Sequence, residues 1–134
     1  MIDLATELLK KHEGYRRFPY LDTVGVQTIG YGRNLQNVGI SEVEASQLLS
    51  NDIGRAVVEL ISMSYFKDLS DVRKAVLVDM VVNLGFPRFS AFRKLDRALR
   101  RGEFDLAKDE MLDSLWAHQV KGRAVELAEM MEKG

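Results

Sequence analysis

The apolar residues at the start of the chain recur with the spacing of one helical face. They are Ile2, Leu4, Ala5, Leu8 and Leu9. This spacing predicts a short amphipathic helix over residues 2–12, and Gly14 is a residue type at which helices end. Glu13 is therefore expected at or just past the last turn of this helix.

Between residues 15 and 33 the helical spacing disappears, and residue types that favour strands take over. They are Tyr15, Phe18, Tyr20, Val24, Val26, Thr28, Ile29 and Tyr31. Pro19 and the glycines of this stretch are incompatible with a long helix. The pattern predicts a small antiparallel hairpin or three-stranded piece, with turns near Asp22–Gly25 and Gly30–Gly32.

A second helix is predicted over residues 42–61. Ser41 followed by Glu44 has the spacing of a capping box, which marks the start of a helix. The apolar residues that follow recur in steps of three to five residues. At about 1.5 Å per residue, such a helix is long enough to span a small domain.

The rest of the chain, residues 71–134, is helical in pattern throughout. The stretch 71–84 is apolar on nearly every side and is followed by Gly85, so we predict a buried central helix there. Three further stretches complete a helical bundle: "FSAFRKLDRALRRG", which ends at Gly102, "EFDLAKDEMLDSLWAHQV" and "KGRAVELAEMMEKG".

These elements predict an α+β fold in a single domain, residues 1–134. A small antiparallel sheet lobe covers about residues 14–35, and a connecting helix covers about 41–62. The larger helical lobe covers about 66–134 and includes the N-terminal helix. Two unequal lobes predict a cleft, and clefts are where ligands bind. A chain of 134 residues is long enough for one domain but not for two.

Composition narrows the possible chemistry. The formal net charge is -1, which gives no indication of nucleic-acid or membrane binding. There is no cysteine, which excludes a thiolate metal site or a cysteine nucleophile. The only histidines, His12 and His118, are far apart in sequence, so we expect no zinc site, and no cofactor is predicted. Neither a signal peptide nor a membrane span is predicted, so we expect the protein in the cytoplasm until something else releases it.

Two acids in the N-terminal region suit the cleavage of a glycosidic bond. One carboxyl must be protonated to donate to the leaving oxygen, and the other must be ionised to activate water or to attack carbon. Glu13, between the helix and the hairpin, and Asp22, in a polar turn, are the candidates, and the Thr28 hydroxyl is a candidate for holding a water. The alternative is that Glu13 is a solvated helix end and Asp22 a common turn residue.

The stretches "HEG" and "YLDTVGVQTIGYG" resemble the signature of the phage-type lysozymes, glycoside hydrolase family 24. The similarity continues in order through "DVRKAVLVDMVVNLG", "FSAF" and "SLWAHQVKGRA", so it covers nearly the whole chain. It implies a lysozyme-like fold and hydrolysis of the β-1,4 bond between N-acetylmuramic acid and N-acetylglucosamine in peptidoglycan. It also implies Glu13 as general acid, Asp22 as the base that directs water, Thr28 as the residue that positions it, and an inverting reaction.

The resemblance also suggests roles for residues outside the acid pair. Gly32, Asn83 and Arg123 are predicted to bind substrate. Arg123 matches a family arginine near the acid, where its charge would favour the ionised carboxylate, but a surface cation is an equal alternative. For Asn83, which could bond a sugar amide, the alternative is a helix-end cap. Trp116 is predicted to lie in the core and not to stack on a sugar.

Two positions depart from the family pattern. Arg33 stands where many relatives have histidine, and the resemblance pairs this position with Asp52, so an Arg33–Asp52 ion pair is predicted. Leu115 stands where relatives often have arginine, which removes a charge from the predicted cleft. The cations between Arg88 and Arg101 could attract the anionic wall, but a solvated helix face is the simpler interpretation.

Two other functions remain open at this point. A lytic transglycosylase shares the fold but needs only the glutamate, and a wall-binding phage protein needs no catalysis. Under the lysozyme interpretation, the partner is peptidoglycan and the enzyme is a monomer. It is made in the host cytoplasm from a phage or prophage gene and acts on the cell wall after release, which we expect to depend on a separate holin-like membrane protein.

Overall fold

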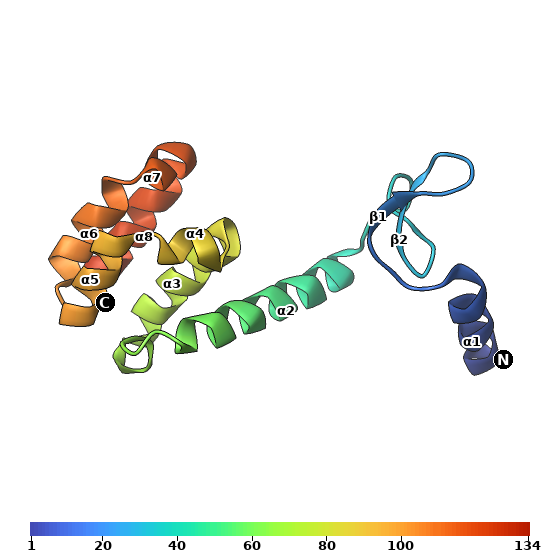
Figure 1. Cartoon of the computed structure of the whole chain (residues 1–134), viewed down its shortest axis with the longest axis horizontal. Helices are drawn as coiled ribbons and strands as arrows, with labels where there is room; N and C mark the ends of the chain where they lie inside the picture. Colours follow the sequence, from blue (N-terminus) through green and yellow to red (C-terminus); the bar gives the residue numbers. More distant parts are fainter. The chain divides into compact units, whose positions relative to one another are not determined.

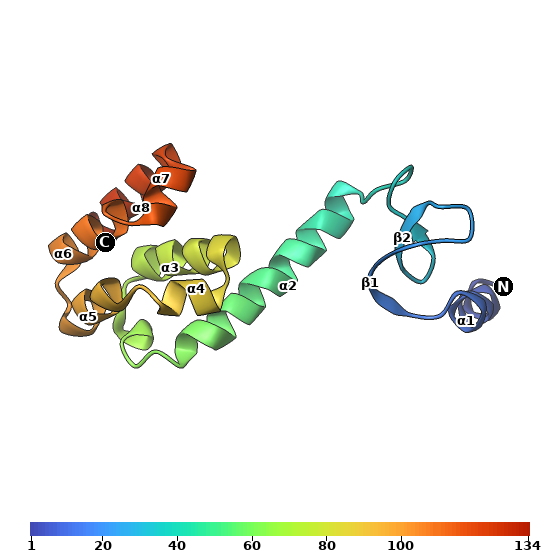
Figure 2. The same ribbon diagram turned by 45° about the horizontal axis from the view of Figure 1, so that its top comes forward.

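The computed structural model describes residues 1–134 and divides them into two compact units. The N-terminal unit is Met1–Leu48 and the C-terminal unit is Leu49–Gly134. Each unit is described by itself below. Both are drawn in Figure 1, and Figure 2 turns the same ribbon by 45°.

The N-terminal unit contains one helix and a three-stranded antiparallel sheet. Its elements are α1 (Ile2–Glu13), β1 (Arg16–Leu21), β2 (Gln27–Gly30) and β3 (Arg33–Asn34). The strand order is β1-β2-β3, with Tyr20 opposite Thr28 and Ile29 opposite Arg33. The predicted helix and the predicted three-stranded piece with its two turns are thus confirmed.

Helix α2 (Glu42–Ile61) begins where the sequence predicts. Ser41 Oγ accepts the backbone N–H of Glu44 at 3.1 Å, and Glu44 Oε1 accepts the backbone N–H of Ser41 at 2.9 Å. These reciprocal bonds are the predicted capping box, which satisfies two donors that a helix start would otherwise leave unpaired.

The C-terminal unit is entirely helical apart from its connections. After the second half of α2 it contains the short 3-10 helix η1 (Phe66–Asp68), α3 (Asp71–Leu84), α4 (Phe86–Ser90), α5 (Arg93–Arg101), α6 (Phe104–Leu112), α7 (Leu115–Val120) and α8 (Gly122–Lys133). Helices α6 and α8 pack side by side, and α3 contacts both α4 and α8 (Figures 1 and 2). The predicted α+β fold class, with a small sheet and a helical bundle, is confirmed.

Two stretches with continuous helical pattern are each divided in two. Ala91 and Phe92 separate α4 from α5, and Asp113 and Ser114 separate α6 from α7. Ser114 begins the new helix because its hydroxyl accepts the backbone N–H of Ala117 at 3.1 Å. The apolar spacing runs through both interruptions, so periodicity alone does not reveal them.

Helix α3 supplies a large part of the core but is not buried on every side within the C-terminal unit. Val76, Leu77 and Met80 are fully buried, whereas Val72 and Val82 are 40% and 38% exposed. The bundle covers one face of α3 and leaves the other open. Within the C-terminal unit, the predicted buried helix is therefore covered on one side only.

The apolar core lies wholly in the C-terminal unit. Its largest fully buried side chains are Leu60, Leu77, Met80, Leu99, Met111, Met131 and Val76. Trp116 is 2% exposed, which confirms its predicted place in the core. None of the helices is both long enough and apolar enough to cross a membrane.

Candidate active site

Glu13 is the last residue of α1, and the helix ends there because Gly14 takes a positive φ of 72°. The side chain of Glu13 is exposed. Two contacts hold this end of α1 against the turn that joins β2 to β3. The rings of Tyr15 and Tyr31 lie 5.8 Å apart, and Lys10 Nζ lies 5.3 Å from the centre of the Tyr31 ring. The turn therefore lies beside the candidate acid.

Gly32 in this turn lies directly against the Glu13 side chain. A Cβ atom added to Gly32 would be 2.8 Å from both Cδ and Oε2 of Glu13, closer than real Cβ atoms approach other heavy atoms. The backbone of Gly32 also has a positive φ of 78°. The sequence predicts Gly32 as a substrate contact, and the structure places it against the candidate general acid.

Asp22 occupies the turn between β1 and β2. Its Oδ1 accepts two backbone N–H groups, from Val24 and from Val26, each at 2.9 Å. A carboxylate that bonds to the backbone a few residues ahead fixes both the turn and its own orientation. The other oxygen, Oδ2, accepts no hydrogen bond from the protein, so it is available to a ligand or a water.

Thr28, at 4% exposure, is the only buried residue of the N-terminal unit. Its hydroxyl donates to the backbone carbonyl of Val26 at 2.9 Å. The same carbonyl accepts the backbone N–H of Asp22 at 2.9 Å. The peptide groups of Val26 thus join the two predicted water-handling residues, one through its N–H and the other through its C=O.

This arrangement defines what each group can do. The Thr28 hydroxyl uses its proton on Val26, so it can only accept a hydrogen bond from a water. The free oxygen of Asp22 can accept a proton. Glu13, from a different element, supplies a second carboxyl group. Sequence reasoning found all three side chains but not Val26, because a backbone group leaves no mark in the residue types.

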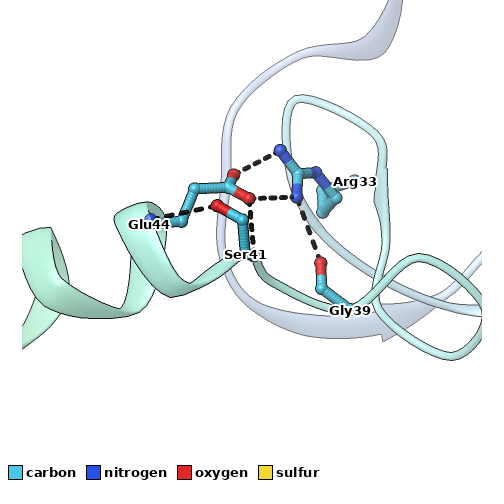
Figure 3. A network of polar contacts seen from close by, with 4 residues as sticks. All are labelled: Arg33, Gly39, Ser41 and Glu44. Carbon is cyan, nitrogen blue, oxygen red and sulfur yellow. Dashed lines mark hydrogen bonds and ion pairs between the residues drawn. The ribbon is translucent and has the colours of Figure 1, made fainter.

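The ion pair predicted for Arg33 is wrong about its partner. Arg33 forms a bidentate pair with Glu44 that includes a bond of 2.9 Å from Nη1 to Oε1 (Figure 3). Nη1 also donates to the Gly39 carbonyl at 3.1 Å. Asp52 is instead paired with Arg55, three residues along the same helix. Glu44 lies in the first turn of α2, close to β3 in sequence, whereas Asp52 lies about 12 Å further along the helix.

The Arg33–Glu44 pair changes the acidity of both groups. The hydrogen bond from Arg33, followed by the bonds to Ser41, lowers the pKa of Glu44 to about 2. In return, the hydrogen bond to Glu44 raises the pKa of Arg33 above its ordinary value. The capping box at Ser41 and Glu44 was visible in the sequence and is the signal that could have identified the partner of Arg33.

The remaining predicted site residues lie in the C-terminal unit, and each has a protein partner. Asn83 Oδ1 accepts the indole N–H of Trp116 at 2.8 Å. Arg123 Nε donates to Asp79 Oδ1 at 2.9 Å. Asn83 keeps its amide N–H groups for another acceptor. Asp79 was not identified from the sequence as a partner of Arg123.

Leu115, where the sequence departs from the family pattern, is 73% exposed. It lies at the edge of two hollows of the C-terminal unit, each about 380 Å³. Ala91 and Phe92 line both hollows as well. The first hollow also has Lys94 and Glu110 on its walls, so charges of both signs face the exposed leucine.

Known proteins are similar to this chain over most of its length. The family model described as phage lysozyme matches residues 10–131. The chain is 26% identical to the pre-baseplate central spike protein Gp5 of Enterobacteria phage T4 over 147 aligned positions, which cover 88% of this chain and 26% of that protein. It is 24% identical to the protein named "Probable T4-type lysozyme 1" of Dictyostelium discoideum over 164 positions, which cover 100% of this chain and 96% of that protein. The chain thus spans about a quarter of the first relative and nearly all of the second.

Proposed function

Because the chain belongs to the phage lysozyme family, we propose that it hydrolyses the β-1,4 bond between N-acetylmuramic acid and N-acetylglucosamine in bacterial peptidoglycan. The observation that supports this most directly is the link between Asp22 and Thr28 through Val26. A free carboxylate oxygen and an accepting hydroxyl, both held by the backbone of one residue, are the groups that a nucleophilic water needs.

The proposed reaction is an inverting hydrolysis. Glu13 donates its proton to the glycosidic oxygen as the bond between that oxygen and the anomeric carbon breaks. A water held by Thr28 attacks the anomeric carbon from the opposite face and gives its proton to Asp22. Both carboxyl groups return to their starting states once a proton passes from Asp22 to Glu13 through solvent.

Three further residues are proposed as substrate contacts. Gly32 leaves the backbone beside Glu13 open to a sugar. The amide N–H groups of Asn83 can donate to an acyl carbonyl, and its Oδ1 is oriented by Trp116. Arg123 binds Asp79 through Nε and Nη2, which leaves Nη1 for a substrate carboxylate. Gly32 lies in the N-terminal unit, and Asn83 and Arg123 lie in the C-terminal unit.

The test is the clearing of purified cell walls by wild type, Glu13→Gln and Glu7→Gln. Glutamine keeps the size of the side chain but donates no proton as a general acid. We expect Glu13→Gln to lose about 10²–10⁴ in rate. Glu7→Gln changes an exposed acid of the same helix and should keep full activity. Near-wild-type clearing by Glu13→Gln would remove the assignment.

The products separate this function from its alternatives. Hydrolysis leaves reducing N-acetylmuramic acid ends, and inversion gives them first as the α-anomer, which NMR detects before mutarotation. A lytic transglycosylase would leave 1,6-anhydro ends, which differ in mass by one water. The water-handling pair of Asp22 and Thr28 favours hydrolysis. A wall-binding protein without activity would bind the walls and release neither product.

A further inference from the structure

The turn between β2 and β3 contains two glycines that differ in one respect. Gly30 and Gly32 both have positive φ, 68° and 78°. An added Cβ at Gly30 would meet nothing within 4 Å, whereas at Gly32 it would meet the side chain of Glu13. The positive φ therefore favours glycine at both positions. Only at Gly32 does the side chain of another residue occupy the space that a Cβ would fill.

The space that a Cβ of residue 32 would fill is occupied by the carboxyl group of Glu13. The added Cβ would lie 2.8 Å from Cδ and Oε2 of Glu13 and 3.1 Å from Cγ. Glu13 is exposed and makes no hydrogen bond with the protein, so its flexible side chain would move aside while the backbone stays. A methyl group at residue 32 would thus displace the proton donor, and its cost to the fold would come from the positive φ and not from the contact with Glu13.

The contacts around the turn make this space a fixed one. The Tyr15–Tyr31 ring contact and the cation–π contact of Lys10 with Tyr31 hold the end of α1 beside residues 31 and 32. These contacts hold the backbone of Gly32 at a fixed place beside the Glu13 carboxyl. Because the Glu13 side chain makes no hydrogen bond with the protein, its placement depends on this contact with the Gly32 backbone.

We propose that Gly32 is a positioning residue for the general acid: the absence of its side chain creates the space in which the Glu13 carboxyl lies. This role goes beyond the substrate contact proposed above and rests on the proposed function of Glu13. A misplacement of about 1 Å in a reacting group can cost about 10²-fold in rate. A methyl group at this position therefore acts on catalysis through Glu13.

The experiment compares Gly32→Ala with Gly30→Ala, which is a matched control. Alanine at either position adopts an unfavourable positive φ, so both variants should show similar falls in melting temperature. We expect Gly32→Ala to lower kcat on soluble glycan fragments by about 10²-fold with little change in KM. Gly30→Ala should keep its kcat. A rise in KM at constant kcat would leave Gly32 with the substrate contact alone and overturn the positioning role.

A second measurement needs no activity. In protein labelled with ¹³C at the glutamate side chains, the carboxyl signal of Glu13 is assigned by its absence from Glu13→Gln. This signal should move in Gly32→Ala and stay in place in Gly30→Ala. An unmoved signal in Gly32→Ala would overturn the positioning role. If the signal moves while Glu13→Gln still clears walls, the positioning stands and the proposed function of Glu13 fails.

Three further variants exclude ambiguous outcomes. If Gly32→Ala does not fold, the comparison is made with Gly32→Asn and Gly30→Asn, because asparagine tolerates positive φ better and still has a Cβ. In a Glu13→Gln background, Gly32→Ala should have no further effect on the residual kcat, since the proton donor is already lost. A further 10²-fold loss there would show that Gly32 acts independently of Glu13 and would contradict the proposal.

Discussion

The two units of this protein are built in contrasting ways. The C-terminal unit holds every buried hydrophobic side chain, in a core of leucine, valine, methionine, alanine and aromatic residues. The N-terminal unit buries none, and its single buried residue is the polar Thr28. Its geometry comes from hydrogen bonds, an ion pair and glycines. The C-terminal unit is therefore held together by many similar apolar contacts, whereas the geometry of the N-terminal unit is set by a few specific polar contacts.

This contrast separates stability from proposed catalysis. A change in the apolar core should alter the free energy of unfolding and leave the activity of folded molecules intact. A change at the candidate catalytic side chains of the N-terminal unit should do the reverse. The predictions below test this separation, beginning with the largest expected effect.

Asp22→Asn should lose activity and keep stability. The amide oxygen of asparagine can replace Oδ1 and accept the N–H groups of Val24 and Val26, so the turn persists. The variant has no carboxylate to take the proton of water, and the expected loss in wall clearing is about 10²–10⁴. Turbidity assays and thermal unfolding of the same preparation measure both quantities. Full activity, or a large fall in melting temperature, would contradict the separation.

Leu77→Ala should lose stability and keep activity. Leu77 is fully buried in α3, and removing such a side chain costs about 2–5 kcal/mol. Val72→Ala is the matched control, because Val72 lies in the same helix at 40% exposure and should cost much less. Urea unfolding gives both free energies. Wall clearing per folded molecule, well below the transition, should equal wild type in both, and a specific loss in Leu77→Ala would break the comparison.

Glu44→Gln should show the smallest effect, and one that depends on pH. The folded pKa of Glu44 is about 2, below the ordinary value of 4.5. Its ionised form is thus favoured in the folded state, so the stabilisation is fully present above about pH 4.5 and is lost as pH falls toward 2. The melting temperatures of wild type and Glu44→Gln should differ by a constant amount from about pH 6 to 9 and converge in acid.

Glu42→Gln provides the control for this prediction. Glu42 is another acid in the first turn of α2, but it is not bonded to Arg33 or Ser41. Its replacement removes a charge near the helix start without touching the network, so its pH dependence in acid should be much weaker. Equal curves for the two variants would mean that the Arg33–Glu44 pair contributes nothing beyond the charge at a helix start.

Local signals in the sequence were enough for most of the fold. The capping box at Ser41 and Glu44 located the start of α2, and Gly14 located the end of α1. The interruption at Ser114 was missed because the apolar spacing continues across it. The exposed face of α3 was missed because residue types do not tell which apolar side of a helix its neighbours cover.

The candidate site was predictable in its side chains but not in its connections. Glu13, Asp22 and Thr28 were identified through their spacing and the family resemblance, and their roles stay predictions. The bond of Thr28 to the Val26 carbonyl and the contact of Gly32 with Glu13 depend on backbone positions. The choice of Glu44 over Asp52 as the partner of Arg33 depends on where each carboxylate falls along α2, which residue types alone do not specify.

One oxygen atom of Glu44 has a consequence for how the chain folds. Oε1 accepts both the backbone N–H of Ser41 and Nη1 of Arg33 (Figure 3). The first bond initiates a helix, and the second joins that helix to a strand eleven residues earlier. Closing so short a loop costs little chain entropy, and nucleating a helix is the costly step of its formation. We therefore expect the start of α2 and the end of the sheet to form together, as a single cooperative event early in folding.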